Sequence, residues 1–343
     1  MKVLAYRFSA FGDVALVVPA IRSIINSHEN VEITFVSRKV FEPLFHNIPG
    51  FTFYGIDLED YNGLMGLRRL YKELELLANW DCVLDLHGVI RTWVLNAFFR
   101  IDNYAVFSID KGRKEKKLLT RKTNKIRTRL KHSVQRTLDV FAAAGLHAIQ
   151  DNSLTIHSNK EEHKVSLDAF LSSKNLHKTT PWIAVAPFSV HLQKEWSIDK
   201  VNELIKEFVD RKYCVFLFGA GEKERAELDK IETNYENVFN LAGNLELGAE
   251  ILLLEQIDLM ISMDSFNMHL ASLLGVKVVS IWGATHPFAG FGPLNDNEQF
   301  IVQRDDLPCR PCSVFGNKSC YRGDLACLDI EVEEVLRAIG RAL

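Results

Sequence analysis

The sequence has no apolar run long enough to cross a bilayer, which takes about 20 residues. Its first apolar run is interrupted by Arg7, and the next, residues 14–21, is short and contains Pro19. No targeting segment is visible either. We therefore expect a cytoplasmic protein without a membrane span.

Two phosphate-binding fingerprints are also missing from the loop after the first predicted strand. Residues 8–13 have neither the Gly-x-Gly-x-x-Gly of dinucleotide-binding domains nor the Gly-Lys-Ser/Thr ending of a P-loop. The absence of the dinucleotide-binding motif therefore argues against a dehydrogenase. The net charge is only -3, so any attraction to a polyanion has to come from a local patch.

Apolar residues make up 47% of the chain and fall into short runs separated by segments of helical periodicity. The runs do not alternate between apolar and polar residues, which is typical of parallel strands covered on both faces. The predicted strands are residues 2–7, 31–36, 81–86, 104–109, 182–187, 213–218, 259–262 and 276–282. The predicted helices are residues 14–27, 63–79, 133–144, 198–211, 222–234, 246–255 and 331–342. We expect an α/β protein with doubly wound parallel sheets.

This order of strands and helices occurs twice, and 343 residues is the length of two ordinary domains. We expect a first domain over residues 1–156, and a linker with the start of the second domain over 157–178. The second domain continues over 179–305, and a cysteine-containing segment with a final helix covers 306–343. Ligands of such sheets bind at the carboxyl ends of the strands. Both domains are therefore expected to face a central cleft.

Asp13 follows the first predicted strand, where a helix begins. As an N-cap it would accept hydrogen bonds from amides of the first turn. As a general base it would take the proton of an attacking hydroxyl group. The spacing alone favours the cap, but the roles are compatible because a helix N-terminus keeps a carboxylate ionised.

In the second half, Lys194, Glu222, Asp264 and His269 each follow a predicted strand. Taken singly, each has an ordinary structural explanation. Lys194 would be a solvated surface lysine, and Glu222 would be a favourable charge at a helix start. Asp264 would be a helix cap, and His269 would lie on the surface of a helix. Taken together, they offer a cation and helix-start amides, which bind a diphosphate.

In order and spacing, these segments resemble glycosyltransferase family 9, the lipopolysaccharide heptosyltransferases, over nearly the whole chain. The matching residues are Arg7, Ser9, Gly12-Asp13, Pro19-Ala20, Lys194-x-Trp196, Leu241-Ala242-Gly243, Ile261-Ser262-Met263-Asp264-Ser265, Met268-His269-Leu270-Ala271 and Trp282-Gly283-Ala284-Thr285-His286-Pro287. Two departures are Phe266, where the family has glycine, and Val190, where it often has a hydroxyl residue.

The resemblance implies a GT-B type fold of two Rossmann-like domains. It implies inverting transfer of heptose from ADP-heptose to a lipopolysaccharide inner-core or lipid A-type acceptor, with Asp13 as the base. The donor-binding residues would be Ser189, Lys194, Glu222, Asp264, Ser265, Phe266, Asn267, His269 and Thr285. No Asp-x-Asp triplet that would hold a metal on a diphosphate occurs in the sequence, so no metal or cofactor is expected for catalysis.

Residues 111–136 contain twelve basic residues opposed only by Glu115. A solvated loop explains such a stretch as well as a binding surface does. As a surface it would receive the phosphates and acidic sugars of the acceptor, at the inner face of the bacterial inner membrane. Candidate acceptor-binding residues are Arg7, Arg91, Lys111, Arg113 and Arg121. Nucleic-acid binding is disfavoured because aromatic residues are not interleaved with the basic ones.

Four of the six cysteines lie close together, at positions 309, 312, 320 and 327. Cys309, Cys312, Cys320 and Cys327 are compatible with a structural zinc site, although the second pair is spaced more widely than usual. A disulfide and unlinked thiols stay open. Cys82 and Cys214 fall in predicted strands and are expected in the core.

Three other functions stay open from the sequence. The first is a glycosyltransferase that uses a different nucleotide-sugar, and the second is one that transfers heptose to a protein. The third is a protein that binds a sugar nucleotide or polysaccharide without catalysis. Because both Asp13 and Lys194 are present, the non-catalytic alternative is disfavoured.

Overall fold

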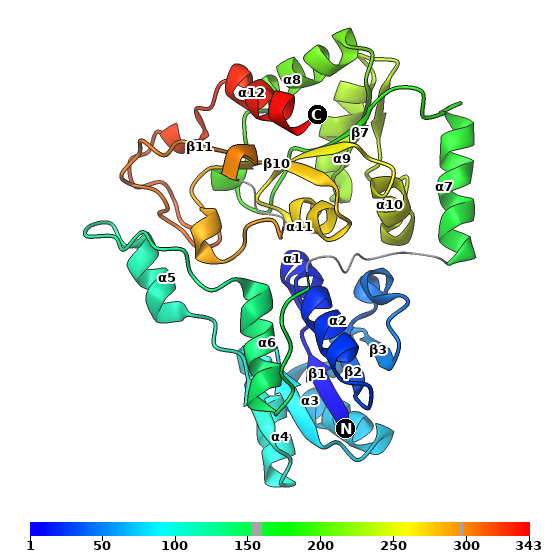
Figure 1. Ribbon diagram of the computed structural model, residues 1–343, viewed down its shortest axis with the longest axis vertical. Helices are drawn as coiled ribbons and strands as arrows, with labels where there is room; N and C mark the ends of the chain where they lie inside the picture. The colour runs from blue at the N-terminus through cyan, green and yellow to red at the C-terminus, as the bar shows by residue number, and fades with distance from the viewer. Residues whose placement is uncertain (152–159, 295–297) are drawn as a thin grey trace. The chain divides into compact units, whose positions relative to one another are not determined.

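The computed structural model describes residues 1–151, 160–294 and 298–343. They form two compact units, each built on an all-parallel sheet with helices packed against it (Figure 1). The predicted α/β class with two doubly wound parallel sheets is confirmed. No helix among the described residues combines the length and apolarity that crossing a membrane requires.

The first unit has a five-stranded sheet with the strand order β3-β2-β1-β4-β5. Its strands are β1 (Lys2–Tyr6), β2 (Glu32–Arg38), β3 (Phe51–Ile56), β4 (Cys82–Asp85) and β5 (Val106–Ser108). Its helices are α1 (Phe11–Ala15), α2 (Val18–Ser27), α3 (Gly63–Leu77), α4 (Ile90–Ile101) and α6 (Ser133–Ala143), with the 3-10 helices η1 (Lys39–Phe45) and η2 (Leu58–Tyr61). The sequence did not predict β3, because this edge strand is mostly half-buried and lacks a continuous apolar run.

The second unit has a six-stranded sheet with the order β11-β10-β9-β6-β7-β8. Its strands are β6 (Trp182–Ala186), β7 (Cys214–Leu217), β8 (Val238–Asn240), β9 (Leu259–Met263), β10 (Lys277–Trp282) and β11 (Ile301–Gln303). Its helices are α5 (Arg113–Thr120), α7 (Glu161–Ser173), α8 (Ile198–Asp210), α9 (Gly221–Glu232), α10 (Leu247–Leu254), α11 (Phe266–Leu273) and α12 (Val332–Ala342). Short 3-10 helices are η3 (Leu192–Lys194), η4 (Pro287–Ala289), η5 (Glu298–Phe300) and η6 (Ala326–Leu328). The sequence did not predict β8 and β11, which have three residues each.

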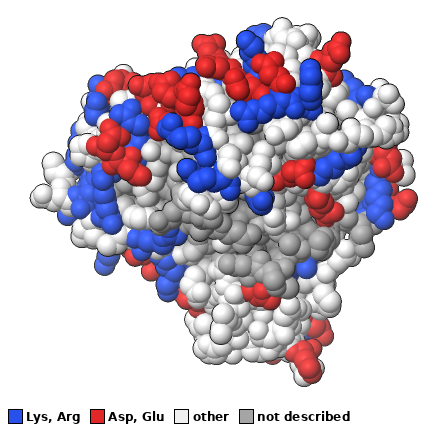
Figure 2. Space-filling view, turned by 45° about the horizontal axis from the view of Figure 1, so that its top comes forward, with Lys and Arg blue, Asp and Glu red and all other residues white. Residues whose placement is uncertain are grey.

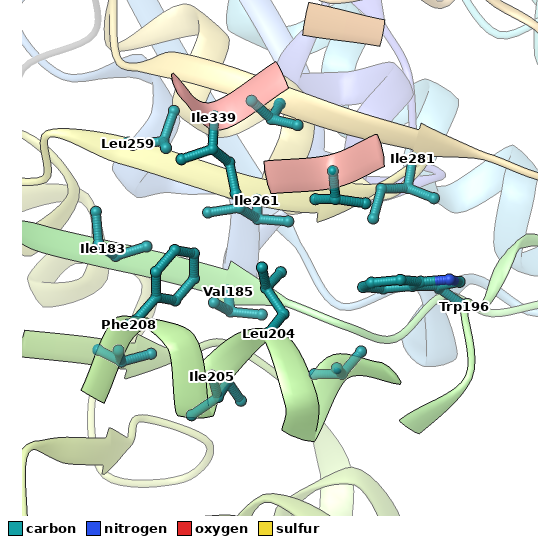
Figure 3. Packing of buried hydrophobic residues seen from close by; sticks show 14 of the residues in the cluster. Ile183, Val185, Trp196, Leu204, Ile205, Phe208, Leu259, Ile261, Ile281 and Ile339 are labelled. Carbon is teal, nitrogen blue, oxygen red and sulfur yellow. The ribbon is translucent and has the colours of Figure 1, made fainter. Parts of the chain in front are cut away.

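The main core cluster of the second unit lies between its sheet and the helices α8, α9 and α12. Side chains of β6, such as Ile183 and Val185, point toward Leu204 and Phe208 of α8 (Figure 3). Trp196 closes one end of this cluster and donates its indole N–H to the carbonyl of Ile330 at 2.9 Å. The burial of these side chains fixes the sheet, and with it the positions of the loops that follow its strands.

The division of the chain differs from the predicted one in one segment. Residues 114–130, expected in the first domain, belong to the second unit, together with residues 157–343. Leu119 and Leu130 are buried against Ala289 of η4 in a small apolar cluster. Because burial of these two leucines is favourable, the basic segment is held on the second unit.

The strand orders place a topological switch point in each sheet. In the first unit the chain moves outward from β1 through β2 to β3 and then returns to the other side of β1 as β4. In the second unit β6 and β9 have the same relation. In doubly wound sheets, ligands bind outside the carboxyl ends of the strands at this point. The loops after β1, β4, β6 and β9 are therefore the places to look for a site.

Candidate active site

Asp13 lies beyond the carboxyl end of β1 and forms an ion pair with Arg7. The distance from Arg7 Nη2 to Asp13 Oδ2 is 2.6 Å. The Arg7 guanidinium is buried, and its other nitrogens donate to the carbonyls of Ser9 (3.1 Å) and Leu86 (2.6 Å). Arg7 is thus fixed by protein partners from the loops after both β1 and β4, and it holds one oxygen of Asp13.

The structure does not support the interpretation of Asp13 as a helix cap. Helix α1 begins at Phe11, its N-cap residue is Ala10, and no side chain caps it. Asp13 is the third helical residue, and its side chain is 24% exposed. A carboxylate that is oriented by a buried cation and still open to solvent is suited to accept a proton.

A second polar group follows β4, on the other side of the same switch point. The buried carboxylate of Asp85 accepts hydrogen bonds from the backbone N–H of His87 (2.9 Å) and Gly88 (2.8 Å). It also accepts one from the side-chain amide of Asn96 (2.8 Å). Gly88 has φ of +61°, which glycine adopts at no steric cost. This turn fixes the backbone from which His87 projects.

His87 joins the loops after β4 and β1. Its Nε2 lies 3.2 Å from Ser9 Oγ. Burial, and then the positive charges of Arg7 and Lys111, lower the pKa of His87 to about 3. The imidazole is therefore neutral at physiological pH.

Sequence reasoning did not single out Asp85 or His87. The signal was present, because a buried strand ends in an aspartate there, as the strand before Asp264 does. It was overlooked because nothing in the sequence alone shows that β4 lies beside β1.

Three of the predicted acceptor-binding cations lie in the first unit near this network. Burial, and then the charge of Arg7, lower the pKa of Lys111. Arg113 donates to the carbonyl of Gly88 (3.3 Å), and Arg91 adds to the positive charges that act on His87. Arg121 is not part of this group, because it belongs to the segment held on the second unit.

In the second unit, Lys194 and Asp264 meet at the switch point between β6 and β9. The distance from Lys194 Nζ to Asp264 Oδ2 is 3.2 Å, and the two side chains are only 13% and 9% exposed. The stem of Lys194 packs on Gly316, where a Cβ would come within 2.5 Å of Lys194 Cδ. Ser189, which follows β6, donates from Oγ to the carbonyl of Asp264 at 3.4 Å. The explanation of Lys194 as a solvated surface residue is therefore wrong.

Helix α11 begins directly after Asp264. Ser265 is its N-cap residue but makes no capping bond, and its Oγ lies 3.1 Å from Ser262 Oγ. Phe266 and Asn267 form the first turn of the helix, at its positive end. His269 is buried, so it is not a residue of the helix surface. The predicted cap and surface interpretations fail here, and the helix start lies beside the Lys194–Asp264 pair.

Two further predicted donor-binding residues follow β10, which lies beside β9, and β7, which lies beside β6. Thr285 follows β10, is buried, and its Oγ1 has no hydrogen-bond partner among the described residues. Glu222 is exposed in the first turn of α9, after β7. The neighbouring Glu224, and not Glu222, accepts the bond from the N–H of Ala220 (2.8 Å). The side chain of Glu222 is thus not used to close the turn.

The four clustered cysteines line one small cavity in the second unit but are free thiols. Within the described part of the chain, no group of three or more His, Cys, Asp or Glu side chains is arranged to hold a metal ion. Of the three possibilities that the sequence left open, the structure shows unlinked thiols. Cys82 and Cys214 are core residues, as predicted.

Arg310 fastens the cysteine segment to the loops after β10 and β11. Its buried guanidinium donates five hydrogen bonds, to the carbonyls of Trp282, Gly283, Thr285 and Arg304 and to the side chain of Gln303. We expect Arg310→Met to destabilise the protein by about 3 kcal/mol, because buried carbonyls lose their donors. Urea unfolding monitored by tryptophan fluorescence measures this, with the exposed Arg322→Met as control. Equal stability of the two variants would contradict it.

Comparisons with known proteins concern the family and the fold of the chain. The family model of glycosyltransferase family 9 (heptosyltransferase) matches residues 67–319, well over half of the chain. The lipopolysaccharide core heptosyltransferase OpsX of Haemophilus influenzae is 23% identical over 338 residues, with 96% of this chain and 93% of the relative covered.

Two solved structures are similar over their full length. A glycosyl transferase family 9 structure from Veillonella parvula matches with a TM-score of 0.78 and 19% identity, covering 99% of this chain and 96% of the other. The E. coli heptosyltransferase WaaC with ADP-2-deoxy-2-fluoro heptose matches with a TM-score of 0.66 and 17% identity, covering 100% of both chains.

Proposed function

The chain belongs to glycosyltransferase family 9, the heptosyltransferase family, and from this premise we propose that it transfers heptose from ADP-heptose to the inner core of a lipopolysaccharide. The relatives named above act on, or bind, such molecules. The observation that carries the proposal is the polar group at each switch point: Arg7 and Asp13 in one unit, Lys194 and Asp264 in the other.

The second unit supplies the donor site in this proposal. The ammonium group of Lys194 and the amides at the start of α11 neutralise the diphosphate, whose negative charge grows as ADP leaves. Asp264 then exchanges its bond with Lys194 for bonds with the sugar hydroxyls. Ser189, the buried Thr285 and the exposed Glu222 complete the set, with Glu222 directed to the ribose.

The first unit supplies the base. Asp13 takes the proton of the acceptor hydroxyl as its oxygen attacks the anomeric carbon from the face opposite ADP, which inverts the configuration. Arg7 holds the Asp13 carboxylate in place through their ion pair. Lys111, Arg113 and Arg91 supply positive charge for an acceptor that carries phosphate or carboxylate groups.

Nucleotide binding tests the donor. Calorimetry with ADP, UDP, GDP and NAD in the presence of EDTA should show selective binding of ADP. Preference for UDP or GDP would keep the chemistry but change the donor, and binding of none would favour a protein that binds its sugar ligand without catalysis. Full activity in EDTA is expected, since the phosphates are neutralised by Lys194 and helix amides. A requirement for a divalent metal would contradict this.

The segment 114–130 is the proposed contact with the anionic membrane surface where the acceptor resides. Lys125 and Arg127 are tied to the carbonyls of Pro311 (2.7 Å) and Leu307 (2.9 Å). Lys114, Lys117 and Arg121 are exposed. Lys and Arg side chains are dense along the left of Figure 2, the side on which α5 lies in Figure 1.

We expect replacement of Lys114, Lys117 and Arg121 by glutamine to weaken binding to phosphatidylglycerol vesicles by tenfold or more at low salt. Each basic residue near an anionic surface contributes about 1 kcal/mol. Vesicle co-sedimentation measures this, with phosphatidylcholine vesicles as the uncharged reference. The matched control removes three exposed lysines elsewhere on the second unit: Lys206, Lys223 and Lys230. Equal binding of the two triple variants would contradict a specific role for the segment.

A further inference from the structure

His87 carries a polar atom that the protein does not use. The residue is 8% exposed, and its Nδ1 is buried without a hydrogen-bond partner. Buried polar atoms in native proteins are nearly always paired, so an exception marks a place where another molecule is bound or a strain is stored. His87 lies at the switch point of the first unit, where such sheets bind ligands.

The surroundings of His87 indicate which chemical group of a bound molecule could pair with Nδ1. Nε2 is engaged by Ser9 Oγ at 3.2 Å, so Nδ1 is the remaining polar atom of the ring. Of the two nitrogens of a neutral imidazole, one donates and the other accepts. A hydroxyl group both donates and accepts, and it therefore pairs with Nδ1 in either tautomer. The nearby charges of Arg7, Lys111 and Arg91 exclude a cationic ligand.

A continuous set of contacts connects His87 with the proposed base. His87 contacts Ser9, the carbonyl of Ser9 accepts from Arg7 Nε at 3.1 Å, and Arg7 pairs with Asp13 at 2.6 Å. Asp85 fixes the His87 end of this set through the backbone. The ring thus has a fixed place relative to Asp13.

We propose that His87 binds the acceptor: its Nδ1 forms a hydrogen bond with a hydroxyl group of the acceptor sugar and so holds the reacting hydroxyl at Asp13. This assignment rests on the proposed function, because it takes the first unit as the acceptor side. It predicts that His87 acts on the acceptor and not on the donor, whose residues lie in the second unit.

The kinetic test uses three variants of the full chain with ADP-heptose as donor and a deacylated, heptose-free lipopolysaccharide core as acceptor. His87→Phe keeps a ring but removes both nitrogens. We expect it to raise KM for the acceptor about tenfold, the effect of one lost hydrogen bond, and to change KM for the donor less than twofold. His87→Asn, which restores a polar atom near the position of Nδ1, should recover most of the loss. The exposed His147→Phe, in the same unit, is the control.

A binding measurement separates this inference from the proposed function. In protein with 15N-labelled histidine, the ring-nitrogen resonances of His87 should shift when the same core is added without donor. Unchanged resonances at saturating core, or an unchanged acceptor KM in folded His87→Phe, would overturn the role of His87. If the wild-type protein transfers no heptose, the proposed function fails, and the resonances alone decide whether His87 binds the core.

Discussion

The Asp13→Asn variant is expected to lose about a thousandfold in kcat for heptose transfer and to bind ADP as the wild type does. A general base contributes about 10²–10⁴-fold to a rate, and asparagine cannot take a proton. The amide has nearly the shape of the carboxylate and keeps an oxygen for Arg7, so the fold of the loop is retained. Steady-state kinetics with ADP-heptose and the heptose-free core, beside calorimetry with ADP, measure both effects.

The matched control for this variant is Asp139→Asn. Asp139 also lies in the first unit and pairs with a cation, Lys131, at 2.5 Å, but the two side chains are 43% and 47% exposed. Its substitution should leave kcat unchanged. A kcat for Asp13→Asn within tenfold of the wild-type value would remove Asp13 from the role of base.

The second large effect is expected at Lys194. We predict that Lys194→Met weakens ADP binding by about 30-fold or more, because a hydrogen bond to a charged group contributes about 1.5–3 kcal/mol. The variant should also be less stable than the wild type, since the buried Asp264 is left without its partner. Calorimetry and urea unfolding measure the two effects separately.

Two further variants separate ligand binding from stability. The double variant Lys194→Met with Asp264→Asn should regain much of the stability but not the ADP affinity. Lys178→Met is the control. Lys178 pairs with Asp258 at 2.9 Å, and these residues precede β6 and β9, at the amino ends of the strands. If Lys178→Met weakened ADP binding as much as Lys194→Met, the site at the carboxyl ends would be misplaced.

The sequence predicted those features that depend on local pattern. Buried strands such as β1, β6 and β9 have continuous apolar runs, and Asp13, Lys194 and Asp264 follow these strands in the chain. Because strand ends of parallel sheets share one edge, their general location followed. The pairing of Lys194 with Asp264 did not follow, since it depends on β9 lying beside β6.

The features that were missed depend on tertiary contacts. His87 was overlooked because its significance comes from Ser9 and Arg7, which reach it only when β4 lies beside β1. The basic segment 114–130 was assigned to the wrong unit because its charges obscured Leu119 and Leu130, whose burial decides where it packs. The four cysteines suggested a metal by spacing alone, whereas the structure fastens their segment with Arg310.

The central claim is that this chain joins heptose from ADP-heptose to a lipopolysaccharide core, with Asp13 as the base. The most direct measurement incubates the wild type and Asp13→Asn with ADP-heptose and the heptose-free core in EDTA and analyses the products by mass spectrometry and NMR. We predict that the wild type adds one heptose with inverted anomeric configuration and that Asp13→Asn adds almost none. No heptose added by the wild type, or equal addition by both proteins, would contradict the account.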